Sequence, residues 1–363
     1  MAEETSSEPQ TSIEPQWSQS FTGHADIEAS LAKNIVDKRV PQALLFAGPQ
    51  GVGKATLAYR LARDLLDDPV VDTIGMFGDE PASSQLREID PGSNCFRLVA
   101  SKAHPDLLVV EREVNATTKR LRPEIVVEQI RKVGNFLHLT PSLSKRRVVI
   151  VDGADRLNRN AANALLKSLE EPPVNTTVIL VASVLGRVLQ TLRSRCIIKN
   201  FKPLSSTETL SIMNSLKEEG RLDMNFNSEG FSDLSTSAGQ LVRLNQSNSE
   251  AAFELWQKLM SEMPRVSWPE VHALASDVAK TGREQTWELL TDAQLDWIGR
   301  CAKSLASQKA DPGFLTGTKL DQWLALWEKT RKLFNDADRL NIDKNQTWVT
   351  AWFQLEKVLQ NRG

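Results

Sequence analysis

The residues from Gly48 to Lys54 form a glycine-rich segment that suits phosphate binding. An apolar run (43–47) precedes it and a helical pattern follows, so backbone N–H groups and a helix N-terminus would face an anion. The next residue should be serine or threonine, whose hydroxyl binds Mg²⁺, but it is Ala55. Thr56 does not replace it, because one step along a helix turns the side chain by about 100°. We therefore expect a degenerate nucleotide site, where ATP or ADP could bind without being required, formed by Gly48, Gly51, Gly53, Lys54, Ala55, Thr56 and Asp152.

An apolar run rich in β-branched residues (148–151) follows Arg147 and ends in Asp152, about 100 residues after Lys54. In phosphate-loop proteins an aspartate at such a strand end helps to hold Mg²⁺. The alternative interpretation is a turn residue that closes the strand. Gly153 follows, where hydrolytic proteins of this layout carry a glutamate that activates water, and glycine has no side chain that could act as a general base. Hydrolysis by this chain alone is therefore not expected.

These residues must be positioned by a fold, and the sequence pattern predicts one. Apolar strands alternate with helices through residues 21–200, which is typical of a parallel sheet covered on both faces. Five strands can be placed, so we predict an α/β fold. A small helical segment (201–247) and a longer all-helical region (248–363) follow. Residues 1–20 are predicted to be a disordered acidic tail, and residues 69–103 an irregular insertion or decayed module.

The composition excludes several classes of protein. The net charge of −2 gives no general attraction to nucleic acid, so any DNA contact must be local. No run of 18 apolar residues and no secretory leader is present, so we expect no membrane span and a cytoplasmic protein. The three cysteines form no CxxC pair, so neither a disulfide framework nor a metal site is indicated.

Six segments carry a resemblance to a known family. They are the 42–48 run Gln-Ala-Leu-Leu-Phe-Ala-Gly, His104-Pro105-Asp106, Glu128-Gln129-Ile130-Arg131, Thr140-Pro141, the 163–173 string Asn-Ala-Leu-Leu-Lys-Ser-Leu-Glu-Glu-Pro-Pro, and Thr191-Leu192-Arg193-Ser194-Arg195-Cys196. Together they resemble the AAA+ clamp-loader family. The 163–173 string and the Ser-Arg-Cys motif are more specific than the glycine loop. Beyond residue 200 the resemblance lies only in the helical layout.

The resemblance implies a RecA-like AAA+ domain at 21–200, a helical lid at 201–247 and a helical collar at 248–363. The collar would join five subunits in a ring that loads a sliding clamp onto primed DNA during replication by DNA polymerase III. The implied partners are gamma/tau and delta subunits, the clamp and DNA, and no membrane. Arg195 matches the family's trans arginine finger, which stabilises charge on a phosphate in a neighbouring subunit's ATP site. The alternative for Arg195 is a salt bridge at a loop end.

Departures from the family pattern indicate which kind of subunit this is. Ala55 and Gly153 suit a subunit without hydrolysis of its own and argue against the ATP-hydrolysing gamma/tau type. Many members carry a four-cysteine zinc module after the first phosphate-loop helix, where this chain has only Cys95, so we expect no zinc. The remaining alternatives are a gamma/tau-type subunit, another AAA+ ATPase, and a scaffold without chemistry.

Overall fold

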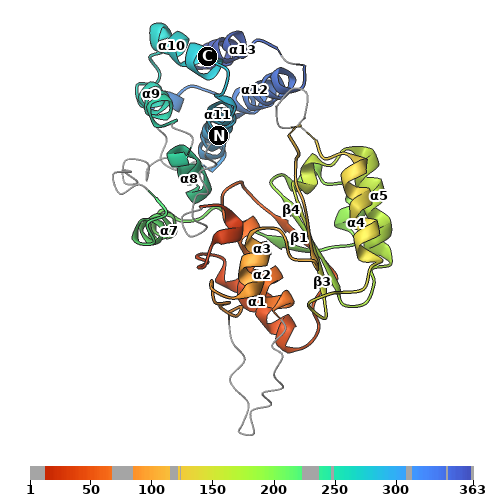
Figure 1. The fold of residues 1–363 in the computed structure, drawn as a ribbon. Helices are drawn as coiled ribbons and strands as arrows, with labels where there is room; N and C mark the ends of the chain where they lie inside the picture. The colour runs from red at the N-terminus through yellow and green to blue at the C-terminus, as the bar shows by residue number, and fades with distance from the viewer. Residues whose placement is uncertain are drawn as a thin grey trace, which may run out of the picture. The chain divides into compact units, whose positions relative to one another are not determined.

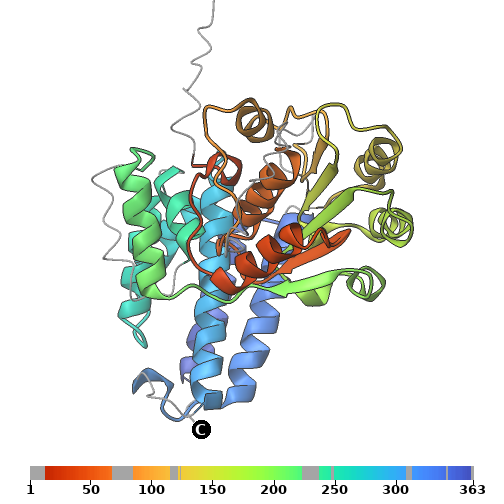
Figure 2. The same cartoon turned by 90° about the horizontal axis from the view of Figure 1, so that it is seen from below.

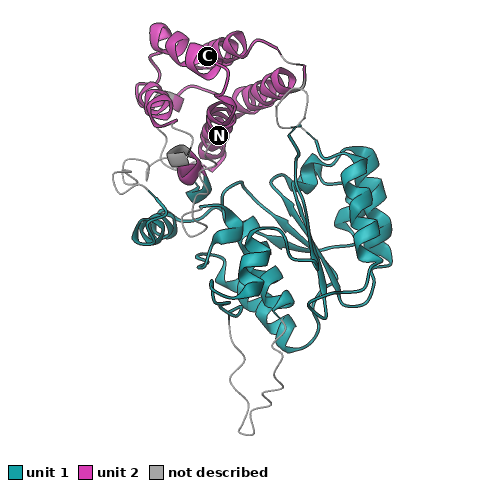
Figure 3. Ribbon diagram, in the orientation of Figure 1, with its two compact units in different colours: residues 1–239 teal, residues 240–363 magenta. Residues whose placement is uncertain are grey.

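The protein is represented by a computed structural model that describes residues 13–67, 85–114, 122, 124–222, 237–246, 249–307, 313–340 and 342–360. The chain divides into two compact units, residues 1–239 and residues 240–363 (Figure 3). The first unit holds the sheet and the candidate sites. The second is built from helices. No helix in the described ranges is both long and apolar enough to cross a bilayer.

A five-stranded parallel sheet forms the centre of the first unit (Figure 1). Its strands are β1 (Ala43–Ala47), β2 (Leu107–Val110), β3 (Arg147–Asp152), β4 (Thr176–Ala182) and β5 (Ile197–Asn200). Their order across the sheet is β2-β3-β4-β1-β5, so the phosphate-loop strand β1 lies between β4 and β5. The register pairs Leu44 with both Ile179 and Ile197. The sequence prediction of an α/β fold with five parallel strands is confirmed.

Helices cover both faces of this sheet, because alternate strand residues point to opposite sides. Leu44, Phe46 and Ile150 pack beneath one group of helices, whereas Leu45 and Val151 pack beneath the other. The first group is α1 (Ala25–Val36), α2 (Lys54–Leu66) and α3 (Asn94–Ala100). The second is α4 (Val127–Leu137), α5 (Arg159–Glu170) and the short α6 (Gln190–Arg193). Figure 2 shows the same layers from a second direction.

Parallel strands give the sheet two chemically different edges. The C-terminal edge carries the loop after β1, the end of β3 at Asp152 and the residues after β4. The N-terminal edge carries Asp106 before β2, Arg147 at the start of β3 and Arg195 before β5. Side chains on loops at one edge can meet each other, and side chains at opposite edges are separated by the length of a strand.

The acidic tail is ordered further toward the N-terminus than expected. We predicted disorder through residue 20, but Pro15–Trp17 form a 3₁₀ turn that lies against α2 and α3. Arg63 donates to the carbonyl oxygens of Gln16 and Ser18, and Trp17 contacts Phe96 at 6.4 Å between ring centroids. Two arginine side chains buried in α2 thus hold this segment, since Arg60 also donates to the Gln19 carbonyl. Residues 1–12 lie outside the described residues.

The boundaries after the sheet also differ from the prediction. We expected separate segments at 201–247 and 248–363, but the first unit extends to residue 239. It includes α7 (Ser206–Glu218) and the first two residues of α8 (Ala238–Gln246). Part of the expected irregular insertion is also helical: Ser93 caps α3, while 68–84 lie outside the described residues.

The second unit is an assembly of helices around buried tryptophans. Trp256 donates to the Gln294 side chain at 2.8 Å and Trp287 to Asp338 at 2.9 Å, so these polar ring atoms are paired inside the core. Most of the expected all-helical region is confirmed as helical. Its helices after α8 are α9 (Glu250–Ser261), α10 (Trp268–Val278), α11 (Glu284–Ser307), α12 (Leu320–Leu340) and α13 (Lys344–Gln360).

Candidate functional sites at the two sheet edges

The glycine loop has the backbone of a phosphate loop. Gly48, Gly51 and Gly53 all have positive φ, and α2 begins at Lys54 directly after them. A side chain at Gly48 would overlap the Phe201 carbonyl oxygen, so this turn requires glycine. The structure therefore places the loop where the sequence predicted it, between β1 and a helix N-terminus.

Lys54 is directed at its own loop. Its side chain is buried, and Nζ donates to the Gly48 carbonyl oxygen at 2.7 Å and to that of Pro49. A phosphate at this loop would compete with those carbonyls for the ammonium group. Ala55 and Thr56 occupy the second and third positions of α2, and both are half-buried.

The start of α8 lies directly on the loop. Gly239 donates its N–H to the Gly51 carbonyl oxygen at 3.0 Å. A Cβ at Gly239 would stand 2.5 Å from the Gly51 Cα, so only a glycine allows this approach. Backbone atoms thus occupy the space beside Gly51.

Asp152 ends β3 at the same edge. Burial raises the pKa of its carboxyl group, and the opposing attraction of Lys54 is smaller. Gly153 follows with φ of 105°, a conformation that a glutamate would adopt only with strain. Mg²⁺ prefers several oxygen ligands in octahedral geometry. With Ala55 in place of the hydroxyl, these residues do not fit a catalytic Mg²⁺ site.

His24 lies beside the loop, where it contacts Phe201. It precedes α1 with φ of 52°, and its ring is 4.7 Å from that of Phe201. Burial lowers its pKa, more than the nearby Asp26 and Glu208 carboxylates raise it. The imidazole is therefore neutral at neutral pH, and its ring packs against that of Phe201.

Arg195 lies at the opposite edge of the sheet. It precedes Ile197, which pairs with Leu44, so Arg195 is level with residue 42 and about six residues before Gly48 along β1. At roughly 3.3 Å per residue this corresponds to about 20 Å. The structure does not bring Arg195 together with Lys54 and Asp152, although sequence analysis named all three.

The guanidinium of Arg195 is partly exposed and anchored on one side. Nη2 pairs with Glu170 Oε1 at 2.5 Å, and Nη1 donates to the Thr191 carbonyl at 2.9 Å. Glu170 is the last residue of α5, and sequence reasoning gave it no role. The available signal was an acidic residue at a helix C-terminus, where the helix dipole disfavours negative charge.

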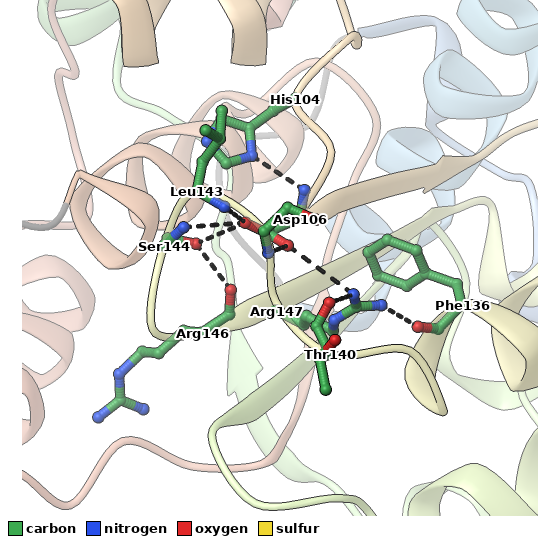
Figure 4. A network of polar contacts seen from close by, with 9 residues as sticks. His104, Asp106, Phe136, Thr140, Leu143, Ser144, Arg146 and Arg147 are labelled. Carbon is green, nitrogen blue, oxygen red and sulfur yellow. Dashed lines mark hydrogen bonds and ion pairs between the residues drawn. The ribbon is translucent and has the colours of Figure 1, made fainter.

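A second network lies at this N-terminal edge (Figure 4). The buried Asp106 carboxylate accepts N–H groups from Ser142, Leu143 and Ser144 at 2.7–2.9 Å. Burial would raise its pKa, but these hydrogen bonds outweigh burial and lower it. Arg147 donates to the carbonyls of Phe136 and Thr140 and lies 3.9 Å from Asp106. Asp106 and Arg147 thus hold the loop that connects α4 to β3 through hydrogen bonds to its backbone.

Comparison with known proteins identifies the family. The model of the "DNA polymerase III, delta subunit" family matches residues 23–205, which is half of the 363-residue chain. The chain belongs to the DNA polymerase III delta subunit family. The matched range includes the glycine loop, Asp106, Asp152 and Arg195, and it confirms the resemblance to clamp-loader proteins.

The chain is also similar to individual curated proteins and solved structures. The chain is 36% identical over 155 residues to DNA polymerase III subunit delta' of Pseudomonas aeruginosa, covering 43% of this chain and 41% of that protein. It is 26% identical over 229 residues to the gamma subunit of Buchnera aphidicola (Schizaphis graminum strain), covering 63% and 56%. A gamma subunit-related structure from Thermotoga maritima matches with TM-score 0.42 and 16% identity, covering 92% and 99%. The chain thus spans about half the length of these curated relatives.

Proposed function

We propose that this chain is a delta-prime-type subunit of a bacterial DNA polymerase III clamp loader. In this role it helps to load the sliding clamp onto primed DNA in the cytoplasm. It does not hydrolyse ATP itself, and it supplies Arg195 to the ATP site of a neighbouring subunit. Its partners are gamma/tau and delta subunits in a pentameric ring.

The position of Arg195 carries the proposal. An exposed arginine about 20 Å along the sheet from its own phosphate loop cannot serve that loop. It can meet a phosphate only if another chain supplies one. The Pseudomonas delta' relative, at 36% identity, supports the choice of subunit.

The phosphate loop supports the absence of independent hydrolysis. Lys54 is bonded to loop carbonyls, Ala55 offers no metal hydroxyl, and Gly153 offers no base. The second candidate is an ATP-hydrolysing gamma/tau-type subunit, favoured by the longer match to the Buchnera gamma subunit. Hydrolysis by the purified chain distinguishes the two.

The purified chain should show no steady ATP turnover. An Ala55→Ser variant should also show none. The added hydroxyl does not supply the general base that is missing at Gly153, and it does not change the backbone conformation there. Phosphate release measured over a range of chain concentrations checks this. Turnover that rises with chain concentration and disappears in Lys54→Ala would establish the gamma/tau alternative, since a contaminating ATPase would survive that substitution.

Co-purification tests the partners. Tagged chain mixed with delta and gamma/tau subunits should elute as one complex. A chain that forms no complex with either subunit would contradict the proposed assembly.

A further inference from the structure

The ion pair between Glu170 and Arg195 joins two segments that are far apart in sequence. Glu170 ends α5, and Arg195 lies in the turn between α6 and β5. The two side chains are 35% and 47% exposed for Arg195 and Glu170, respectively. Exposed pairs contribute little to stability, so stability alone gives a weak reason for this one.

The local sequence gives a second indication. Glu170 occupies the last turn of α5, where the helix dipole disfavours a carboxylate. A side chain whose charge is unfavourable at its position in a helix, with no compensating contact within that helix, tends to lie at a functional site. The Arg195 guanidinium supplies the compensating charge here.

The geometry leaves part of the guanidinium available. Arginine has five N–H donors. Glu170 accepts one on Nη2, and Thr191 and Ser194 accept up to two on Nη1, so at least two N–H donors are left over on a side chain that is 35% exposed. The contacts with Glu170 and Thr191 together fix the plane of the Arg195 guanidinium. A side chain fixed in advance loses less freedom when it meets a phosphate, which favours catalysis.

We infer that Glu170 is a positioning residue: its carboxylate holds Arg195 in the orientation in which the guanidinium meets a phosphate bound by a neighbouring chain. This inference rests on the proposed function, since Glu170 can have a positioning role only if Arg195 contacts a phosphate in a neighbouring subunit. Glu170 itself touches no nucleotide. It acts on the neighbour's turnover through Arg195 alone.

The test uses the full reconstituted complex and compares Glu170→Gln with Glu171→Gln. The Glu171 carboxylate makes no ion pair within the described part of the chain, so it is a matched control. Glu170→Gln should lower kcat at the facing ATP site by about fivefold, with KM for ATP little changed. A fivefold change corresponds to the free energy that an exposed ion pair contributes. Glu171→Gln should behave as wild type. Glu170→Asp should restore part of the loss, and adding Glu170→Gln to Arg195→Ala should change nothing further.

The outcomes separate the two claims. If Arg195→Ala removes turnover while Glu170→Gln behaves as wild type, the positioning role is wrong and the proposed function stands. Faster turnover in Glu170→Gln would also overturn the inference, because Glu170 would then withhold the arginine. If Arg195→Ala itself has no effect, the proposed function fails first.

Discussion

Replacing Arg195 with alanine should reduce ATP hydrolysis at the facing site of the assembled complex by about a thousandfold or more. A trans arginine finger is worth roughly 10³–10⁵ in kcat, because its charge neutralises the transferred phosphate in the transition state. The loss should appear in a complex in which only the subunit facing Arg195 keeps a working site. Single-turnover hydrolysis with the clamp and primed DNA present measures it.

Two matched variants give this result its meaning. Arg195→Lys should recover little activity, since lysine keeps the charge but lacks the planar fork. Arg39→Ala should behave as wild type, because Arg39 is an exposed arginine before β1 at the same sheet edge. Wild-type turnover in Arg195→Ala would show that the chain is a scaffold without chemistry. An equal loss in Arg39→Ala would show that turnover depends on the total positive charge at this sheet edge and not on the position of Arg195.

Replacing Asp106 with alanine should lower the free energy of unfolding of the first unit by about 3 kcal/mol. The substitution leaves three backbone N–H groups and Arg147 without their carboxylate partner, and removing one partner from a buried polar network is costly. Hydrogen exchange of β2 and β3 amides measures this loss. Glu88→Ala, at an exposed position, should change stability by less than about 0.5 kcal/mol.

The second unit provides an internal control for the same experiment. Eight of the nine tryptophans lie after position 250, so tryptophan fluorescence reports mainly on residues 240–363. Its unfolding transition should not move in Asp106→Ala. An unchanged β3 exchange rate would contradict the role given to Asp106.

The same network predicts a pH dependence. The folded pKa of Asp106 is lowered, so its contribution is present above the unfolded pKa of about 3.9 and is lost as pH falls through the lower folded value. The stability difference between wild type and Asp106→Asn should therefore be constant near neutral pH and shrink below about pH 4. A difference that grows on acidification would contradict the assigned direction.

The phosphate loop was largely predictable from sequence, because its chemistry is local. The three glycines, Lys54 and the missing hydroxyl at Ala55 all lie within eight consecutive residues. The alternation of apolar strands and helices likewise predicts the parallel sheet. The N-terminal segment was not predictable in this way, because an acidic, polar composition does not reveal that Arg60 and Arg63 bind its carbonyl oxygens.

The sequence by itself determined the fold class, the family resemblance and the absence of a hydroxyl at Ala55 and of a side chain at Gly153, since these depend on residue types at fixed spacings. Only the tertiary structure decided where the groups meet. Strand register placed Arg195 at the edge opposite Gly48, and chain packing brought Glu170 to Arg195 and Gly239 to Gly51. Such contacts join residues 25 to 188 positions apart, and local periodicity carries no information about them.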